Sequence, residues 1–178
     1  MKIFISILIV FLFTTFGFGQ KKNEKPDLSG TWQLIESKNF ANQNKSKGDE
    51  PKKLTLEINY REPELKIVRI SSKNSSEKRS EETYYSDERG ETNSGYDNQM
   101  ETTKSKWDGK EFVIARTESV TPEGMKPGVK DIKIKWITKI KLSDDGKTLT
   151  FIYDATAPPG IPTRFATGKP KQTYKRVK

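Results

Sequence analysis

A period of two over residues 132–142 is the sequence feature that most constrains the fold. Ile, Trp and Leu occupy most of the even positions there, and Lys occupies most of the odd ones. This alternation is typical of a β-strand with one face buried and the other in water. Shorter runs of the same kind occur at residues 54–60, 112–114 and 149–153, whereas helical periodicity of comparable length is absent after residue 19. The sequence therefore predicts an all-β domain.

Short turns connect these runs. Residues 107–110 and 144–147 place Asp-Gly between alternating segments, which predicts tight hairpin turns. Residues 61–64 and 87–90 have a similar but less specific composition. Short links between successive strands give an antiparallel up-and-down meander, which we expect to have about eight to nine strands. Since an open meander leaves two unprotected edges, we expect closure into a lipocalin-like barrel, with a sandwich as the alternative.

Three polar or Pro-rich segments interrupt the pattern. Residues 20–28 and 37–53 are predicted to be loops. Residues 155–171 contain four Pro and two Gly and are incompatible with a central strand. A loop of this length is either a cap over an opening or a mobile segment. Residues 172–178 then indicate a short final strand that pairs with the first one.

The first 19 residues have the pattern of a secretory signal peptide. Lys2 precedes a short apolar run, and the segment closes with Gly17 and Gly19 at positions −3 and −1 from the expected cut. A membrane-spanning helix would need about 20 apolar residues. We therefore expect cleavage after Gly19, a single domain over residues 20–178 with no membrane span, and a secreted or periplasmic location. An uncleaved anchor is the alternative.

Composition excludes most familiar enzyme chemistry. The chain contains no His and no Cys, which removes His-dependent triads, thiolate nucleophiles, disulfides and Cys/His zinc sites. No phosphate-binding or dinucleotide-binding glycine motif is present. The acidic turn at residues 144–146 offers too few ligands for Ca²⁺. We expect no enzyme activity, no catalytic residue, no metal and no cofactor. Apolar residues fall to about a quarter of the chain after the signal segment, so the core is thin.

Residues 28–34 read Leu-Ser-Gly-Thr-Trp-Gln-Leu, and their Gly-x-Trp resembles the opening of lipocalin and calycin families. The continuation through residues 37–40 looks like fatty-acid-binding proteins, but the overall pattern is more similar to small secreted bacterial lipocalin-like proteins. This resemblance implies a barrel in which Gly30 and Trp32 form a structural plug at one end. It also implies that a basic residue of the last strand, here Arg176, lies across the Trp ring. In the alternative, Trp32 is only core and Arg176 only a solvated terminus.

Strand parity gives candidates for the barrel interior. Arg116 follows Phe112 and Ile114 on an apolar face, and a buried Arg needs an anion. That anion is a ligand carboxylate, as the fatty-acid-binder resemblance implies, or an internal carboxylate, unless the strand ends and Arg116 lies in water. Aromatic residues with polar tips suit a cavity wall. The candidate ligand-binding residues are Arg116, Trp136, Tyr153, Tyr174 and Arg176.

Charge allows two functional hypotheses. The net charge of +9 favours anionic partners and also solubility. The favoured hypothesis is binding of a small apolar or amphipathic ligand, including a carboxylate. The alternative is a filled barrel whose lysine stripe (Lys133, Lys135, Lys139 and Lys141) contacts an anionic envelope polymer. Nucleic-acid binding is not expected, because that stripe lacks interleaved aromatic residues.

Overall fold

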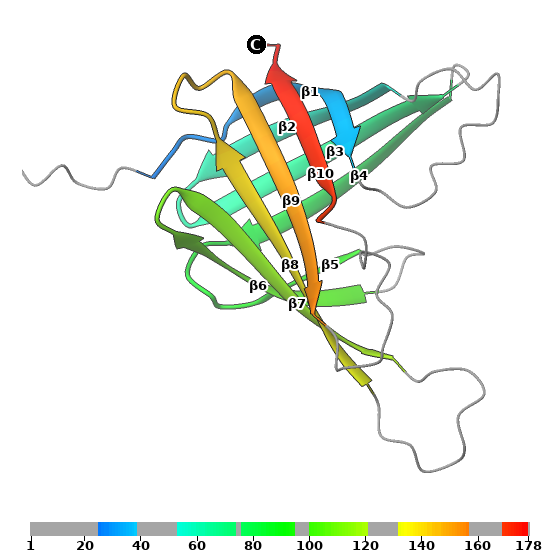
Figure 1. Ribbon diagram of the computed structural model, residues 1–178, viewed down its shortest axis with the longest axis vertical. Coiled ribbons are helices and arrows are strands. Elements are labelled where there is room, and N and C mark those ends of the chain that lie inside the picture. Colours follow the sequence, from blue (N-terminus) through cyan, green and yellow to red (C-terminus); the bar gives the residue numbers. More distant parts are fainter. Residues whose placement is uncertain are drawn as a thin grey trace, which may run out of the picture.

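The computed structural model describes residues 25–38, 53–73, 76–94, 100–120, 132–156 and 169–177. These ranges form ten strands, all paired antiparallel, in one sheet (Figure 1). The strands are β1 (Gly30–Lys38), β2 (Lys53–Arg61), β3 (Glu64–Lys73), β4 (Ser76–Tyr85), β5 (Glu91–Ser94), β6 (Met100–Asp108), β7 (Glu111–Val120), β8 (Ile132–Leu142), β9 (Thr148–Thr156) and β10 (Lys171–Arg176). The predicted all-β meander is confirmed, with ten strands rather than eight or nine.

The first and last strands lie side by side in the middle of the sheet. The strand order is β4-β3-β2-β1-β10-β9-β8-β7-β6-β5, so only the β1–β10 pairing joins elements far apart in the sequence. Trp32 pairs with Arg176 and Leu34 with Tyr174 in this ladder. The predicted pairing of the final strand with the first is therefore confirmed.

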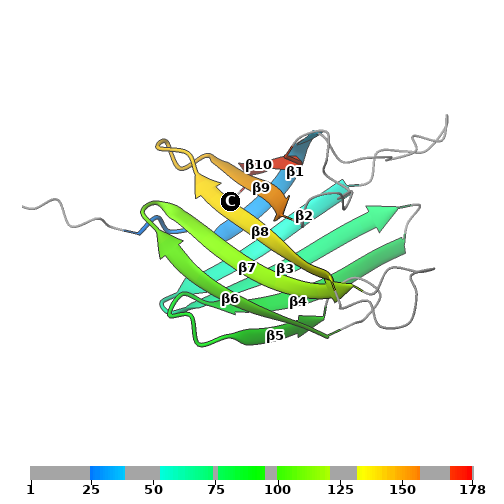
Figure 2. The ribbon, with the colours of Figure 1, turned by 60° about the horizontal axis from the view of Figure 1, so that its bottom comes forward.

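The sheet curls until β4 and β5, its two ends, lie next to each other (Figure 2). In the described residues this seam has no continuous backbone ladder. Instead, the Asn93 side chain bonds to the backbone of Thr83, donating from Nδ2 to the carbonyl oxygen at 2.8 Å and accepting from the N–H at 2.8 Å. The Asn93 side-chain amide thus makes the two hydrogen bonds that the backbone of a paired strand would make. The barrel is therefore nearly closed.

The Asp-Gly turns are formed as the sequence predicts. Gly109 and Gly146 adopt φ of 60° and 68°, the left-handed conformation that tight hairpins need. These turns join β6 to β7 and β8 to β9. They lie in the same end of the barrel as the start of β1, because Arg176 and Val177 bond to the backbones of Lys147 and Thr31 respectively.

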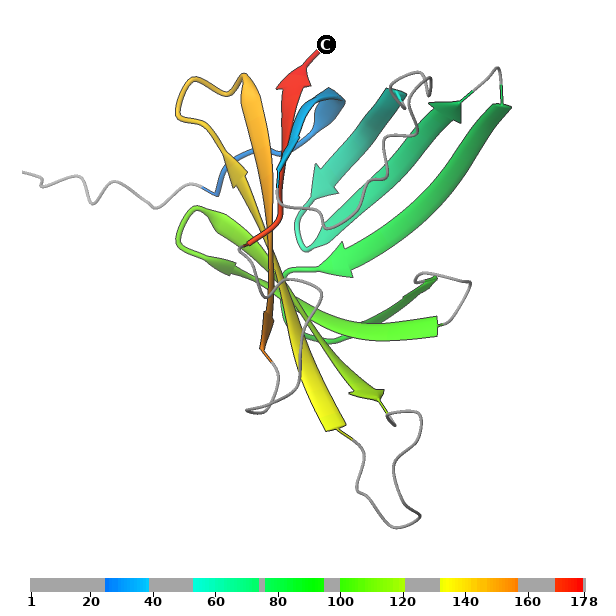
Figure 3. The same cartoon turned by 45° about the vertical axis from the view of Figure 1, so that its right-hand side comes forward.

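The core is apolar at this end. Trp107 of β6 crosses to β2, where its Nε1 donates to the Tyr60 hydroxyl at 2.8 Å, and its ring packs edge-on against Tyr60 and Phe112. Figure 3 shows the two halves of the sheet, β1–β4 and β5–β10, between which such contacts are made. The fully buried apolar side chains are Leu28, Trp32, Leu56, Leu65, Ile67, Phe112, Ile140, Leu149, Phe151 and Tyr174.

Several sequence predictions concern residues outside the described ranges. The signal peptide (residues 1–19), most of the loop at 37–53 and residues 157–168 of the Pro-rich segment are among them. No described segment forms a helix long and apolar enough to cross a membrane. Within the described ranges, no group of three or more His, Cys, Asp or Glu side chains is arranged to hold a metal ion.

Candidate functional site

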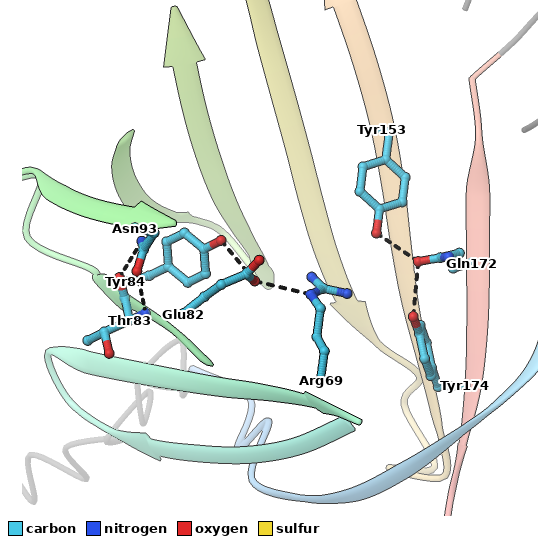
Figure 4. A network of polar contacts seen from close by, with 8 residues as sticks. All are labelled: Arg69, Glu82, Thr83, Tyr84, Asn93, Tyr153, Gln172 and Tyr174. Carbon is cyan, nitrogen blue, oxygen red and sulfur yellow. Dashed lines mark hydrogen bonds and ion pairs between the residues drawn. The ribbon is translucent and has the colours of Figure 1, made fainter. Parts of the chain in front are cut away.

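Six polar side chains from four strands meet inside the barrel (Figure 4). The register of the strands explains why these side chains meet. Leu65, Ile67 and Arg69 alternate along the inner face of β3, and Ile67 pairs with Glu82 of β4. Tyr174 of β10 pairs with the buried Leu149, two residues before Phe151 and four before Tyr153 on the inner face of β9. We call this group the Arg69 cluster; its members are Arg69, Glu82, Tyr84, Tyr153, Gln172 and Tyr174.

An ion pair forms one half of the Arg69 cluster. Arg69 Nε donates to Glu82 Oε2 at 3.1 Å, and the Tyr84 hydroxyl donates to the same oxygen at 3.2 Å. The guanidinium also lies 5.4 Å from the ring centroid of Phe151, so it reaches from β3 across to β9. A guanidinium over an aromatic face is attracted by the ring quadrupole. Arg69 therefore connects the two halves of the sheet through the interior.

A tyrosine pair forms the other half. The hydroxyls of Tyr153 and Tyr174 both donate to Gln172 Oε1, at 2.8 and 2.9 Å. Arg69 lies near both phenols, and its positive charge opposes the rise of their pKa values. In Figure 4 the Arg69 guanidinium lies between Glu82 and the tyrosine pair.

Burial governs the protonation of this network. Burial is the main cause that raises the pKa of Tyr84, Tyr153 and Tyr174 above the ordinary value for a phenol, and the Glu82 charge adds to the shift at Tyr84. Burial also opposes the charge on Arg69, but the Glu82 charge counters it, and the pKa of Arg69 lies above its usual value. At neutral pH the tyrosines are therefore neutral and Arg69 is charged.

The ion pair of the Arg69 cluster is not completely buried. The side chains of Arg69 and Glu82 remain 23% and 20% exposed. Both point inward, Arg69 from β3, which lies between β2 and β4, and Glu82 from β4, which borders the seam with β5. Their exposed surface therefore faces the interior. By contrast, Trp32, Phe112 and Phe151 are fully buried. The Arg69–Glu82 pair is therefore more accessible than the apolar side chains packed beside it.

Arg176 lies across the Trp32 ring, as the resemblance implies, while the role of Gly30 and Trp32 as a plug stays a prediction. The Arg176 guanidinium lies 4.3 Å from the Trp32 ring centroid, and Trp32 Nε1 donates to the Leu28 carbonyl oxygen at 3.1 Å. Gly30 adopts φ of 137°, which side-chain-bearing residues rarely do. The expected cation–π contact is confirmed. Arg176 also donates to the carbonyl oxygens of Gly146 and Ser29, at 2.9 and 2.8 Å, and these contacts secure the floor of the barrel.

Arg116 lies on the inner face of β7, as its parity predicts, but it is paired. It forms an ion pair with Glu101 of β6 and lies 5.3 Å from the ring centroid of Trp136, its cross-strand partner. This is the internal pair that the sequence left open as one of three arrangements. Of the predicted ligand-binding residues, the structure brings Tyr153 and Tyr174 together in the Arg69 cluster, while Arg116 and Trp136 form a separate contact. Their role in ligand binding stays a prediction.

A second buried polar group lies on β5 and β6. Glu91 Oε1 accepts hydrogen bonds from the hydroxyls of Thr103 and Ser105, at 2.9 and 2.5 Å, and all three residues are buried. These bonds anchor the short strand β5, which forms one side of the seam. They were not anticipated from the sequence.

The lysine stripe lies on the outer face of β8. Lys133, Lys135 and Lys141 are exposed, whereas Lys139 is partly buried. Lys139 and Lys141 lie beside Glu111, with N–O distances of 3.1 and 4.0 Å. The positive charge of the lysine stripe is therefore partly balanced by Glu111 of the neighbouring strand β7.

Sequence reasoning missed Arg69, Glu82, Tyr84 and Gln172. The signal for Arg69 was available, because Leu65, Ile67 and Arg69 show the same inward parity that singled out Arg116. Glu82 and Gln172 had no comparable signal, since their roles depend on strand register and on contacts across the barrel.

Comparison with solved structures identifies the fold. The Schistosoma mansoni fatty acid binding protein in complex with arachidonic acid superposes with a TM-score of 0.55 at 12% identity, covering 84% of this chain and 96% of that one. Apo Caenorhabditis elegans lipid binding protein 8 gives 0.52 at 14% identity, covering 83% and 94%. Human cRBP IV gives 0.52 at 18% identity, covering 85% and 99%. The fold is a calycin-type β-barrel.

At these identities the likeness concerns the fold alone. No family model matches the sequence, and no curated protein sequence matches it significantly. The expected calycin-type barrel is confirmed. What the interior of this barrel binds has to be argued from its own side chains.

Proposed function

We propose that this calycin-type barrel binds a small apolar or amphipathic molecule in its interior, with the polar end of the molecule at the Arg69 cluster. One observation carries the proposal: the charged side chains of Arg69 and Glu82 point into an apolar barrel and are still partly exposed there. Ligand sites combine apolar walls with a few convergent polar groups in this way. The similar structures include a fatty acid binding protein in complex with arachidonic acid, which supports the choice of ligand class.

The proposal includes export of the chain. Lys2, the apolar run after it and the Gly17 and Gly19 positions support cleavage after Gly19. The working molecule would then be residues 20–178, secreted or periplasmic. Intact-mass measurement of the protein recovered outside the cytoplasm tests this directly, since retention of residues 1–19 would contradict it.

Native mass spectrometry of the gently purified protein tests the ligand proposal. We expect a stoichiometric small molecule that denaturing extraction releases. Thr138 lies on the inner face between Ile114 and Tyr153, so Thr138→Trp should fill the interior and remove the bound molecule. Lys135→Trp, on the exposed outer face of the same strand, is the matched control. Equal occupancy in both variants would overturn the proposal.

A further inference from the structure

The charge of Arg69 is already matched inside the barrel. Glu82 lies against it at 3.1 Å, and both side chains are mostly buried. The tyrosines around the pair are neutral, because burial raises the pKa of each. The Arg69 cluster therefore carries no net charge.

The hydrogen bonds of the cluster are also balanced. Tyr153 and Tyr174 donate their protons to Gln172, and Tyr84 donates to Glu82. Arg69 lies near the phenols of Tyr153 and Tyr174. A carboxylate entering this site would add a negative charge beside Glu82. Burying a charge without a counter-ion is costly, whereas a neutral hydroxyl brings no such cost.

We propose that the barrel interior selects ligands whose polar end is uncharged, such as a long-chain alcohol, over free carboxylates, and that Glu82 determines this selectivity. The inference rests on the proposed function and names its ligand class. Removing the Glu82 charge would leave Arg69 as an unmatched cation, which is the group that recognises a carboxylate. One substitution should therefore reverse the preference.

The test compares 1-decanol with decanoate, which share one chain length, by calorimetric titration at pH 8, where decanoate is ionised. We expect the protein to bind decanol at least about tenfold more tightly. Glu82→Gln keeps the side-chain shape and should bind decanoate more tightly than decanol. Glu81→Gln is the matched control, because Glu81 is exposed and pairs with Lys66 outside the barrel at 2.6 Å. It should keep the original preference.

A double variant separates charge from damage to the fold. Arg69→Gln combined with Glu82→Gln removes both charges, so its cluster stays neutral and its preference for decanol should persist. This double variant also provides the test if Glu82→Gln alone does not fold.

The outcomes distinguish the two proposals. If neither decanol nor decanoate binds to the unsubstituted protein, the proposed function is overturned and the inference falls with it. If both bind but decanoate is preferred, or if Glu82→Gln folds and leaves the ratio unchanged, the inference alone is overturned.

Discussion

The Arg176 guanidinium lies over the Trp32 ring, 4.3 Å from its centroid, and joins the last strand of the chain to the first. The same side chain bonds to the carbonyl oxygens of Gly146 and Ser29. One residue near the end of the chain therefore connects β1, the segment before it and the β8–β9 turn. These contacts complete the packed floor on which the accessible part of the interior rests.

Arg176→Ala should lower the free energy of unfolding by about 2–3 kcal/mol, since it removes a cation–π contact and two hydrogen bonds to backbone. Arg176→Lys should recover only part of this loss, because an ammonium cannot both stack and bond in one plane. Denaturant unfolding measures both changes. Lys175→Ala, at an exposed neighbouring position, should change stability by less than about 0.5 kcal/mol. Equal effects at the two positions would contradict the plug.

Asn93→Ala should loosen the seam between β4 and β5. It leaves the Thr83 N–H and carbonyl oxygen without their side-chain partner, at a cost of about 1–3 kcal/mol. Hydrogen exchange should show faster exchange at the Thr83 amide and little change in β8. Thr92→Ala, an exposed neighbour on the same strand, is the control. Unchanged exchange at Thr83 would mean that the Asn93 bonds do not hold the seam.

Arg116→Ala should reduce stability without affecting carboxylate binding. The substitution leaves the mostly buried Glu101 without its counter-ion and removes the guanidinium from beside Trp136. We expect a loss of about 1–3 kcal/mol in the free energy of unfolding and an unchanged affinity for decanoate. A selective loss of decanoate affinity would instead assign Arg116 to the ligand site, the role that the fatty-acid-binder resemblance implies.

Stability should fall at alkaline pH because of the buried tyrosines. The native pKa values of Tyr84, Tyr153 and Tyr174 are raised above that of an exposed phenol, about 10. Below pH 10 the phenols are protonated in both states, and their contribution is complete. Above it the unfolded state loses protons first, so the free energy of unfolding decreases as pH rises toward the native pKa values.

Unfolding curves at pH 8, 10 and 11 measure this dependence. Tyr174→Phe removes one of the three groups, so its stability should decline less steeply above pH 10 than that of the unsubstituted protein. An identical slope in both proteins would show that Tyr174 does not contribute.

The parts of the fold that could be predicted from sequence are those in which local pattern and burial agree. β8 alternates apolar and Lys side chains, and the turns at Gly109 and Gly146 carry the residues that their backbone needs. β4 gave no such signal. Its first six residues are exposed and polar, so no alternation marks them as a strand. Pairing with β3 places them in the sheet, and a local sequence does not contain that information.

The residues of the candidate site likewise include some that sequence could predict and others that it could not. Tyr153 and Tyr174 could be predicted because parity places them on the inner faces of their strands. Glu82 could not, because it meets Arg69 only through the diagonal offset between β3 and β4. Gln172 also depends on the fold, since it receives two hydroxyls only after β9 and β10 have paired. Sequence indicated which side chains point inward, and tertiary register decided which of them meet.

The most direct measurement of the central claim is an isotope-filtered NOE experiment between unlabelled 1-decanol and the isotopically labelled protein. We expect cross-peaks from the alcohol to the rings of Tyr153, Tyr174 and Phe151, with the protons nearest the hydroxyl closest to the tyrosines. Cross-peaks confined to the exposed Ile35 and Val177, or none at all, would contradict an interior binding site.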